Sequence, residues 1–543
     1  MNNTLVKVPF PVNEPVRSYG KGSPEKASLK AKIEELSSQQ FDIPIIIGGK
    51  EIQTNDTIEC VMPHNHKHVL AKFHQAGEKE IKMAIDSAMD AQKLWSSMPL
   101  QARVAIFKRI SNLLQGPYRD LINASTMLNQ SKNVFQAEID AACEFIDFIN
   151  FNVKYAEDIY SEQPLYSPDG MWNMVQYRPL EGFVFAVTPF NFTSIAGNLP
   201  TAPAIMGNVA LWKPASSSVY SGYFLMKMFQ EAGLPAGVIN FIPGLGRTIG
   251  NLVMKNENLA GIHFTGSTAV FQSMWKTIGE NIENYKSYPR IVGETGGKDF
   301  ILAHLSADEK ILVSGMIRGA FEYQGQKCSA ASRCYVPKDM WERIKDDYIA
   351  EVKTIKVGDV TDQTNFMNAV IDKASFDNIA SYIEYAKESP LAEIITGGGY
   401  DDSVGYFIEP TTIVTTDPNF KLMCEEIFGP VLTIHPYDQS WEEICEIVDS
   451  TSPYALTGAI FSRCREAIQT AHELLVNAAG NFYVNDKPTG AVVGQQPFGG
   501  SRASGTNDKA GSPLNLLRWV SQRTVKETFN APSDYRYPFL EEK

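Results

Sequence analysis

GFVFAVTPFNFTSIAGNLPTAPAIMGNVALWK, residues 182–213, contains two short apolar runs on either side of a segment with helical spacing. The pattern continues with apolar runs at 238–243, 261–266 and 290–294, each separated from the next by another helix-like stretch. Strands that alternate with helices in this way are typical of a doubly wound, Rossmann-type parallel sheet. We therefore expect an α/β fold that binds a nucleotide.

A second α/β unit is expected from Asp299 to about Asp486, where apolar runs such as FILAHL, SRCYVP and TTIVTT again alternate with helical segments. Before the first sheet, residues 78–160 place apolar side chains at three- and four-residue spacing, which predicts helices. MWNMVQYRPLEG (171–182) alternates like an exposed hairpin. We expect the strand-like tail after Ser512 to pair with it.

Composition narrows the class of protein. The chain has 543 residues, of which 44% are hydrophobic and 20% are charged, close to the average for globular proteins. It carries 49 Lys and Arg against 62 Asp and Glu, so its net charge is −13, and no basic run offsets this. Such a surface repels phosphate backbones and anionic lipid, and no run approaches the ~18 apolar residues of a membrane span. We expect neither nucleic acid nor a membrane as a partner.

The N-terminus and the cysteines indicate the compartment. The N-terminus has no apolar core of the signal-peptide kind, and Glu14 and Glu25 are atypical of a transit peptide. The seven cysteines form no CxxC pair, which predicts reduced thiols. We expect a cytoplasmic protein, or one of the mitochondrial matrix if the source is eukaryotic and the chain is processed. HNHKH (64–68) lacks further ligands at metal spacing, so we expect a solvated turn there and no metal site.

Cys328, in FEYQGQKCSAASRCYV, has surroundings that suit a nucleophile. Small residues flank it, Lys327 precedes it, and Gly325 gives the backbone freedom. A nucleophilic cysteine needs its thiolate favoured by a nearby cation or a helix N-terminus. Taken alone, a cysteine at such a place is more often structural, and we assign Cys334 to packing.

Two polar residues follow buried apolar runs. Glu294, in VGETGGK, could act as a general base on water, although a solvated glutamate at a strand end is the commoner case. Asn191, in VTPFNFTS, could donate to an oxyanion, and its alternative is a turn or helix-cap residue.

Two other motifs suit a nucleotide. Lys213, at the end of NVALWK, could bond ribose hydroxyls, and its alternative is a surface lysine. FTGSTAV (264–270) offers small residues and hydroxyls at the start of a helix, which suits a pyrophosphate. PGLGRTIG is a weak phosphate loop because it lacks the full GxGxxG pattern.

Together, and in this order, the motifs resemble the aldehyde dehydrogenase superfamily from about residue 40 to the C-terminus. They are TPFNF (188–192), LWKPAS (211–216), FTGS (264–267), ETGGK (294–298), GQKCSA (325–330), EEIFGP (425–430) and PFGGSRASG (497–505). Other segments, including NDKPTGAVVGQQPFGG and the N-terminal NEPV (13–16), are similar to the branch that acts on L-glutamate γ-semialdehyde, which forms from 1-pyrroline-5-carboxylate. The resemblance implies NAD-dependent oxidation of that semialdehyde to L-glutamate, the second step of proline breakdown.

The resemblance also implies a role for each site residue. Cys328 would attack the aldehyde, the Asn191 amide and the Cys328 backbone N–H would hold the oxyanion, and Glu294 would activate water to hydrolyse the thioester. The cofactor would be bound by Thr188, Lys213, Ser216, Gly266, Ser267, Thr268, Ala269, Val270, Glu426 and Phe428. The substrate would be bound by Ser329, Gly490, Ala491 and Phe498, with Glu144 at its ammonium group.

The chain departs from the superfamily pattern at three positions. Many members carry a glutamate where Ser216 stands, and that glutamate disfavours NADP. Ser216 removes this repulsion, so the resemblance implies NAD, with NADP as a weaker alternative. Phe271 stands where glycine is usual, and Thr295 stands where leucine is frequent. Neither is expected to touch a reacting atom.

These expectations divide the chain into five parts. They are an N-terminal arm (1–45), an NAD-binding domain with N-terminal helices (46–160 and 181–296), a catalytic domain (297–487), a substrate anchor loop (488–504), and an oligomerisation hairpin with a C-terminal strand (161–180 and 505–543). The hairpin and the strand would form a small β flap that pairs across a two-fold axis, giving a homodimer or a higher oligomer.

Three alternatives stay open at this point. The enzyme could oxidise another semialdehyde, such as a longer amino-acid semialdehyde or succinate semialdehyde. The chain could instead be a thiol esterase or hydrolase, since Cys328 and Glu294 suffice for ester cleavage without a cofactor. A catalytically silent relative is the third alternative, which the presence of Cys328, Glu294 and Asn191 disfavours.

Overall fold

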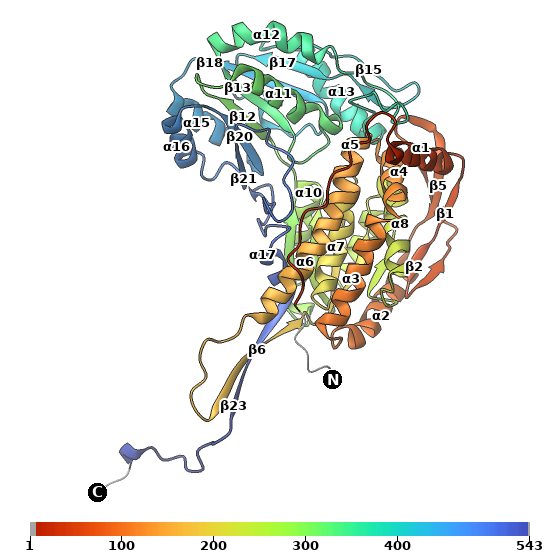
Figure 1. Cartoon of the computed structure of the whole chain (residues 1–543), viewed down its shortest axis with the longest axis vertical. Helices are drawn as coiled ribbons and strands as arrows, with labels where there is room; N and C mark the ends of the chain where they lie inside the picture. The colour runs from red at the N-terminus through yellow and green to blue at the C-terminus, as the bar shows by residue number, and fades with distance from the viewer. Residues whose placement is uncertain (1–6, 541–543) are drawn as a thin grey trace.

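Two seven-stranded sheets dominate the structure, a computed structural model that describes residues 7–540. The ends of the predicted arm (1–6) and of the predicted C-terminal segment (541–543) lie outside the described residues. Figure 1 shows the two sheets as separate units, with a long two-stranded ribbon that extends from one of them.

The first sheet contains the five strands that the apolar runs predict. They are β7 (Phe183–Val187), β8 (Val209–Lys213), β9 (Ile239–Phe241), β10 (Leu259–Thr265) and β11 (Arg290–Glu294). The strand order is β11-β10-β7-β8-β9, all parallel, and β2 (Ile45–Ile47) and β3 (Lys50–Ile52) continue the sheet as antiparallel strands. The chain therefore winds outward from β7 first in one direction and then in the other, which confirms the doubly wound fold.

Helices cover both faces of the first sheet. They are α2 (Glu78–Trp95), α3 (Leu100–Gln115), α4 (Arg119–Gln130), α6 (Phe145–Ser161), α7 (Thr193–Ile205), α8 (Val219–Glu231), α9 (Gly246–Val253) and α10 (Thr268–Glu280). In α2 the buried positions Ile81, Ala84, Ile85 and Ala88 recur at three- and four-residue spacing, so one stripe of the helix faces the core. The short α5 (Val134–Ala137) and the π-helix η1 (Glu138–Glu144) lead into α6.

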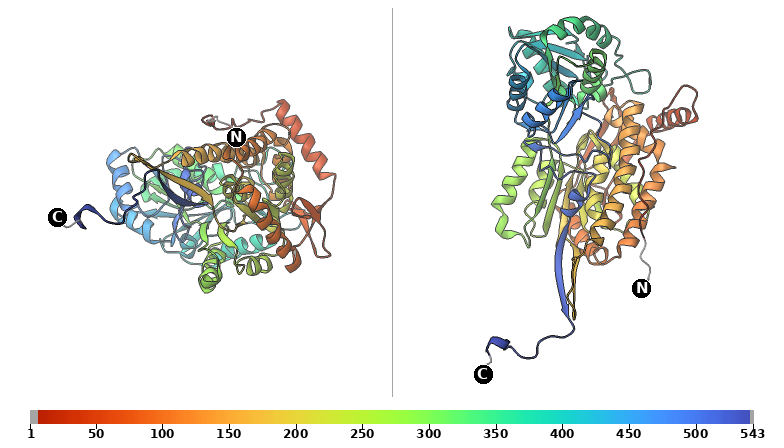
Figure 2. Two further views of the ribbon diagram at one scale, coloured as in Figure 1. Left: turned by 90° about the horizontal axis from the view of Figure 1, so that it is seen from below. Right: turned by 60° about the vertical axis from the view of Figure 1, so that its left-hand side comes forward.

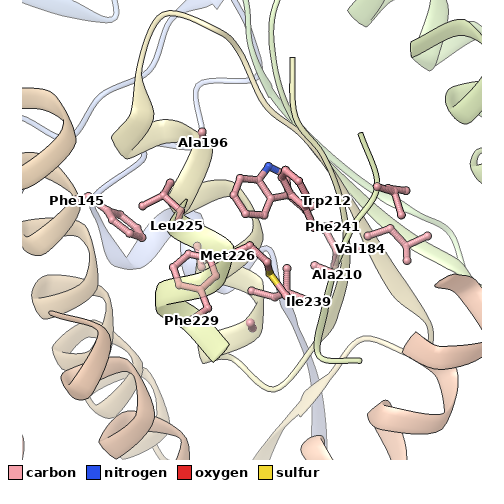
Figure 3. Packing of buried hydrophobic residues seen from close by; sticks show 14 of the residues in the cluster. Phe145, Val184, Ala196, Ala210, Trp212, Leu225, Met226, Phe229, Ile239 and Phe241 are labelled. Atoms are coloured by element: carbon pink, nitrogen blue, oxygen red, sulfur yellow. The ribbon is translucent and has the colours of Figure 1, made fainter. Parts of the chain in front are cut away.

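Large apolar side chains fill the space between the first sheet and α8. The ring centroid of Trp212 on β8 lies 5.0 Å from that of Phe241 on β9 and 6.1 Å from that of Phe229 on α8. Figure 3 shows Met226 beside Ile239 of β9, and Leu225 and Phe229 on the side of Phe145. This packing fixes the strands whose carboxyl ends carry the predicted nucleotide residues.

The second sheet has the order β14-β17-β18-β13-β12-β20-β21. Its strands are β12 (Asp299–Ala303), β13 (Ala331–Pro337), β14 (Ala392–Thr396), β17 (Thr411–Thr415), β18 (Val431–Tyr437), β20 (Thr457–Phe461) and β21 (Asn481–Val484). Its helices are α11 (Glu309–Phe321), α12 (Lys338–Val352), α13 (Lys373–Glu388), α15 (Trp441–Ser450) and α16 (Arg465–Leu474). Residues 295–298 connect β11 of the first sheet directly to β12 of the second.

The residues expected to form a hairpin at 171–180 form a single strand instead. This strand, β6 (Met171–Pro179), pairs antiparallel over its whole length with β23 (Val520–Thr528) of the same chain. The two strands form the ribbon that projects from the body in Figures 1 and 2. The predicted partnership with the C-terminal tail is therefore present, but the turn expected within 171–180 is absent.

The N-terminal part contains a three-stranded sheet that the helical pattern did not reveal. Its strands are β1 (Phe41–Ile43), β5 (Asn65–His74) and β4 (Thr57–Met62), and α1 (Pro24–Ser37) precedes them. Residues 65–68 of HNHKH belong to β5, and His64, just before it, is buried with Nδ1 3.2 Å from Ser131 Oγ, so the expected solvated turn is wrong. Over residues 7–540 no three His, Cys, Asp or Glu side chains are grouped to hold a metal ion.

The helices of residues 7–540 include none whose length and apolar character would let it cross a membrane. All seven cysteines lie in this part of the chain and are free thiols.

Candidate active site

Cys328 lines a cavity of about 460 Å³ to which distant parts of the chain contribute. We call it the Cys328 cavity. Among the residues predicted from sequence, it is also lined by Glu144, Glu294, Ser329, Gly490, Ala491 and Phe498. A volume of this size is within the usual range for small-molecule sites and is ample for a ligand the size of an amino acid.

Cys328 follows a backbone segment that distant contacts hold in place. In the turn η4 (Glu322–Gly325), Tyr323 and Gln324 have φ values of 51° and 56°, in the left-handed region. Such a conformation costs a bulky residue on the order of 1–3 kcal/mol. Tyr323 Oη donates to the carbonyl of Gln130 at 3.1 Å, and Gln324 Nε2 donates to that of Ser131 at 2.9 Å. These bonds offset the strain and set the approach of the chain to Cys328.

The surroundings of Cys328 favour the thiol over the thiolate. Burial raises its pKa well above the usual value, and nearby carboxylates, Asp299 first, raise the pKa further. Lys327 does not counteract this, because its Nζ lies 3.1 Å from Glu322 Oε2 and its charge is neutralised there. The thiol therefore needs a proton acceptor at the moment when it attacks.

Glu294 is placed to accept protons in the same cavity. It ends β11, and its Oε2 accepts a hydrogen bond from the Gly500 N–H at 2.8 Å. Burial raises the pKa of this carboxyl well above the ordinary value for glutamate. A carboxylate with a raised pKa is a stronger base near neutral pH. Considered alone, Glu294 was expected to be a solvated residue at a strand end. In the structure it lines the cavity instead.

Asn191 connects the first sheet to the Cys328 segment. It lies between β7 and α7, is only 4% exposed, and is not among the residues that line the Cys328 cavity. Its Nδ2 donates to the carbonyl of Gln326, two residues before Cys328, at 3.0 Å. An amide nitrogen carries two hydrogens, so the second remains to donate toward an oxygen at Cys328.

The predicted nucleotide residues collect where the parallel strands of the first sheet end. Val187, Lys213 and Phe264, on β7, β8 and β10, are neighbours in register. Thr188 and the segment Gly266–Val270 follow directly, so they lie along one edge of the sheet. We call this edge, with Lys213, the first-sheet edge.

Lys213 is a buried cation without a compensating charge. Burial alone lowers its pKa to about 8, so no carboxylate in residues 7–540 offsets its charge. Its neighbour Thr188 is fixed, because Thr188 N donates to the Lys213 carbonyl at 3.1 Å and Thr188 Oγ1 accepts from Trp212 Nε1 at 3.0 Å. Ser216 opens the short turn η2 (Ser216–Ser218) just beyond. A buried ammonium of this kind needs polar partners such as hydroxyl groups.

Helix α10 begins at the first-sheet edge with free backbone donors. Ser267 caps it and accepts from the Val270 N–H at 3.4 Å. The positive end of the helix dipole therefore faces the edge, as an anion requires. Phe271 stacks on Phe264 with ring centroids 5.4 Å apart and covers Gly293, so the departure from glycine at 271 is explained by packing.

Glu426 reaches the first-sheet edge from the second unit. Its Oε1 accepts from the Gly297 N–H at 3.0 Å, and burial raises its pKa to about 7. Phe428, with φ of 57°, places its ring edge-to-face with Phe190 at 5.8 Å. These residues close the space between the two units beside the edge.

The loop 488–504, which we call the anchor loop, enters the Cys328 cavity with exposed backbone donors. Ser329 Oγ lies 2.8 Å from Thr489 Oγ1, and Lys487 Nζ donates to the Thr489 carbonyl at 2.9 Å. Gly490 has φ of +100°, which a side chain would strain. The loop can therefore present N–H groups to an anion without a side chain in the way.

Glu144 lies across the cavity at the end of the π-helix η1, a kind of irregularity that is frequent at functional sites. Its Oε2 accepts from Ser194 Oγ at 2.9 Å. Burial, followed by the charge of Asp140, raises its pKa to about 8. A cation in the cavity would favour its ionised form.

The cavity contains polar residues that sequence reasoning missed. Lys487 directly precedes PTGA (488–491), and Asp147 is one helical turn after Glu144. Their spacing from residues predicted to bind the substrate could have indicated both. Asn13 and Glu14 of the N-terminal arm also line the cavity, although the arm was expected only to lie over the body.

Comparison with known proteins places the chain among enzymes. A sequence model described as the Aldehyde dehydrogenase family matches residues 51–525. The chain is 56% identical over 536 residues to the delta-1-pyrroline-5-carboxylate dehydrogenase, mitochondrial, of Dictyostelium discoideum, covering 98% of this chain and 96% of that protein. It is 47% identical over 531 residues to the Homo sapiens protein of the same name, covering 97% and 94%.

Solved structures give the same picture. The Delta-pyrroline-5-carboxylate dehydrogenase from Mycobacterium tuberculosis bound with NAD is 49% identical, with a TM-score of 0.96 and full coverage of both chains. The 1-pyrroline-5-carboxylate dehydrogenase from Thermus with bound NAD is 30% identical, with a TM-score of 0.90 and coverage of 96% of this chain and 99% of that one.

Proposed function

The chain belongs to the aldehyde dehydrogenase family, and we propose that it oxidises L-glutamate γ-semialdehyde to L-glutamate with NAD, the second step of proline breakdown. The observation that carries this proposal is the Cys328 cavity, where a thiol, a carboxyl group and an anchor loop with free N–H groups share one space of small-molecule size. The names of the relatives support the same substrate, and the relatives match nearly the whole chain.

The first-sheet edge fits NAD. Lys213 is a buried donor without a carboxylate partner in the described chain, and the start of α10 offers backbone N–H groups to a pyrophosphate. Glu426 is placed to accept from ribose hydroxyls. When bound, NAD supplies the acceptor for the hydride that leaves the substrate. A cofactor-free thiol hydrolase would give this edge no role.

In the first step, Cys328 Sγ forms a bond to the aldehyde carbon as the carbonyl π bond breaks, and the thiol proton passes to solvent in the cavity. The aldehyde oxygen becomes an oxyanion in the resulting thiohemiacetal. The second Asn191 Nδ2 hydrogen and the Cys328 backbone N–H are the donors proposed for that oxyanion. The hydrogen bond from Asn191 to Gln326 holds the amide in register with the nucleophile.

In the second step, the oxidised acyl group is a thioester on Cys328, and Glu294 acts as the general base. It takes a proton from a water molecule whose oxygen bonds to the acyl carbon, and the Cys328 thiolate leaves as L-glutamate forms. The raised pKa of Glu294 suits this role, because the carboxylate accepts a proton readily once ionised.

Substrate selection is proposed to come from the two ends of the cavity. The α-carboxylate would bind Ser329 and the N–H groups of Gly490 and Ala491, while Glu144 would meet the ammonium group. Phe498 would lie along the aliphatic stem. A simple aldehyde would leave these polar groups without partners, which costs binding energy.

The test is formation of reduced nicotinamide from 1-pyrroline-5-carboxylate, succinate semialdehyde and propanal, each with NAD and with NADP. We expect the pyrroline compound with NAD to be strongly preferred. Preference for propanal would leave the chemistry at Cys328 intact, but the roles of Ser329, Gly490 and Ala491 would have to be withdrawn. Preference for succinate semialdehyde would remove the role of Glu144.

We further propose a homodimer or higher oligomer built through the β6–β23 ribbon. Both edges of this two-stranded ribbon lack a strand partner in the described chain, and Trp172 and Phe529 are 60% and 57% exposed near its tip. A sedimentation experiment would show a single-chain species if this is wrong. The compartment proposed is a reducing one, the cytoplasm or the mitochondrial matrix that the relatives' names mention.

A further inference from the structure

The N-terminal arm, residues 7–20, forms part of the wall of the Cys328 cavity, although none of the steps above uses it. Asn13, Glu14 and Val16 line the cavity. Figure 1 shows the arm, in dark red, running along α6. Val8 N donates to Glu157 Oε2 at 3.0 Å, which ties the start of the arm to that helix.

Asn13 uses every hydrogen-bonding group of its side chain to join three elements. Its Nδ2 donates to Asp147 Oδ2 on α6 and to the carbonyl of Val493 in the anchor loop, both at 2.8 Å. Its Oδ1 accepts from Gln495 Nε2 at 2.9 Å. Only an amide side chain can donate twice and accept once in this arrangement.

The anchor loop is thereby held on both sides of Gly490 and Ala491. Near its start, Thr489 is fixed by Ser329 and Lys487. Farther along, Val493 and Gln495 are fixed by Asn13. The N–H groups proposed to bind the α-carboxylate, those of Gly490 and Ala491, lie between these two clamps.

The arm itself is held firmly enough to act as a clamp. The Glu14 N–H donates to Asp147 Oδ1 at 2.8 Å, and Glu14 Oε1 lies 2.5 Å from Arg119 Nη1. Glu138, which is fully buried, accepts from the Arg17 N–H and from Tyr19 Oη, both at 2.9 Å. The contacts of the residues that follow Asn13, beginning with the other residues of NEPV (13–16), therefore hold Asn13 in place.

We propose that Asn13 is a positioning residue that sets the anchor loop for recognition of the substrate's α-carboxylate. The proposal rests on the proposed function, because it assumes that the loop binds that carboxylate. Asn13 does not touch the substrate in this account; it holds the backbone that does. An error of about 1 Å in such a loop is enough to reduce catalytic efficiency strongly.

The test compares Asn13→Asp with Val12→Asp. Asn13→Asp keeps the size of the side chain but turns its donor atom into an acceptor that faces the Asp147 carboxylate and the Val493 carbonyl. Val12 is 81% exposed, so Val12→Asp adds the same charge next to it without entering these contacts. The readout is the ratio of kcat/KM for L-glutamate γ-semialdehyde to kcat/KM for propanal, with KM and kcat reported separately.

We expect Asn13→Asp to lower this ratio about tenfold, mainly through a higher KM for the semialdehyde, while Val12→Asp keeps the wild-type ratio. Asp147→Asn added to Asn13→Asp should recover part of the loss, because the new amide can donate to the new carboxylate. Asn13→Ala serves if Asn13→Asp does not fold, with an expected loss of about threefold.

Three results would overturn the proposal. An unchanged ratio in both Asn13 variants would show that the loop does not need the clamp. Equal losses for both aldehydes would make Asn13 a general stability residue. An equal drop in Val12→Asp would assign the effect to charge alone. If the wild type shows no preference for the semialdehyde, the proposed function fails first, and that result is read before any variant is made.

Discussion

The first-sheet edge and the Cys328 cavity meet at Glu294 but are built from different kinds of structure. At the edge, each residue follows a strand of a regular parallel sheet, and register alone brings Lys213 and Thr188 together. The cavity uses this sheet only in part, through His263, Phe264 and Thr265 of β10 and Val292 and Glu294 of β11. The rest of its wall is irregular and comes from the turn that begins at Glu322, a π-helix, the anchor loop and the N-terminal arm.

The two kinds of structure suit two different tasks, cofactor binding and substrate choice. The geometry of a regular sheet places the donors at its edge without help from distant segments, which suits a cofactor that many related enzymes use. The irregular cavity depends on contacts between residues far apart in sequence, so it can be changed without altering the sheet. We infer that cofactor binding belongs to the edge and substrate choice to the cavity, and each variant below tests this separation.

Cys328→Ala should separate the two regions most completely. Loss of the nucleophile should lower both aldehyde oxidation and ester hydrolysis by at least about a thousandfold, while NAD still binds at the edge. Steady-state rates and NAD titration by fluorescence measure the two properties. Oxidation that persists in this variant would contradict the role of Cys328, and lost NAD binding would contradict the separation.

Glu294→Gln acts where the regions meet. The amide keeps an oxygen for the Gly500 N–H but cannot take a proton from water, so turnover should fall about a hundredfold. Rapid mixing should still show one equivalent of reduced nicotinamide formed quickly, because Cys328 attack comes before hydrolysis. Loss of this first turnover would show that Glu294 is needed before the thioester forms.

Lys213→Met should affect the edge alone, with opposite effects on affinity and stability. KM for NAD should rise about tenfold as a charged donor is lost, with a smaller change in kcat. The pKa of Lys213 is lowered to about 8, so the folded chain without cofactor carries a buried charge that costs on the order of 3 kcal/mol.

The methionine variant should therefore melt at a higher temperature than the wild type when NAD is absent. The size of this difference depends on pH. The buried charge of Lys213 destabilises the wild type fully below pH 8, and this destabilisation decreases as pH rises from there toward the ordinary lysine pKa of about 10.4. A lower melting temperature at pH 7 would show that Lys213 has a compensating partner.

The smallest effect is expected in the cavity, from Glu144. Its pKa is raised to about 8, so the carboxyl is mostly neutral at pH 7 and becomes ionised above pH 8. An ammonium group binds the ionised form better, so inhibition by L-glutamate should strengthen about fivefold from pH 6.5 to 8.5. Glu144→Gln should remove this pH dependence, and a variant that keeps it would assign it to another group.

Much of the edge could be predicted from sequence because each part follows a local rule. Short apolar runs bounded by glycine or proline predicted β7, β8, β9, β10 and β11, and polar residues directly after them fell at the edge. The motifs around Cys328 indicated the family, which the match over residues 51–525 confirms. In these cases the residues that form the sequence pattern and the element or site that the pattern predicts lie within a few residues of each other.

Other features could not be read in this way. The expected hairpin at 171–180 is one strand, because its partner β23 lies more than 300 residues away. Lys327 looked like a cation that would activate Cys328, but Glu322 neutralises it. Burial raises the pKa of Glu294, whereas the hydrogen bond from the Gly500 N–H, more than 200 residues away along the chain, lowers it.

The sequence by itself determined the α/β fold, the order of the first sheet's strands along the chain and the choice of candidate reactive side chains. Tertiary structure alone decided which of those side chains share a cavity, what their pKa values become, and that Asn13 reaches the anchor loop 480 residues further along the chain. The physical reason is the separation along the chain over which each effect acts. Periodicity and turn chemistry act over a few residues, whereas burial, charge and hydrogen-bond geometry depend on every segment that the fold brings to one place.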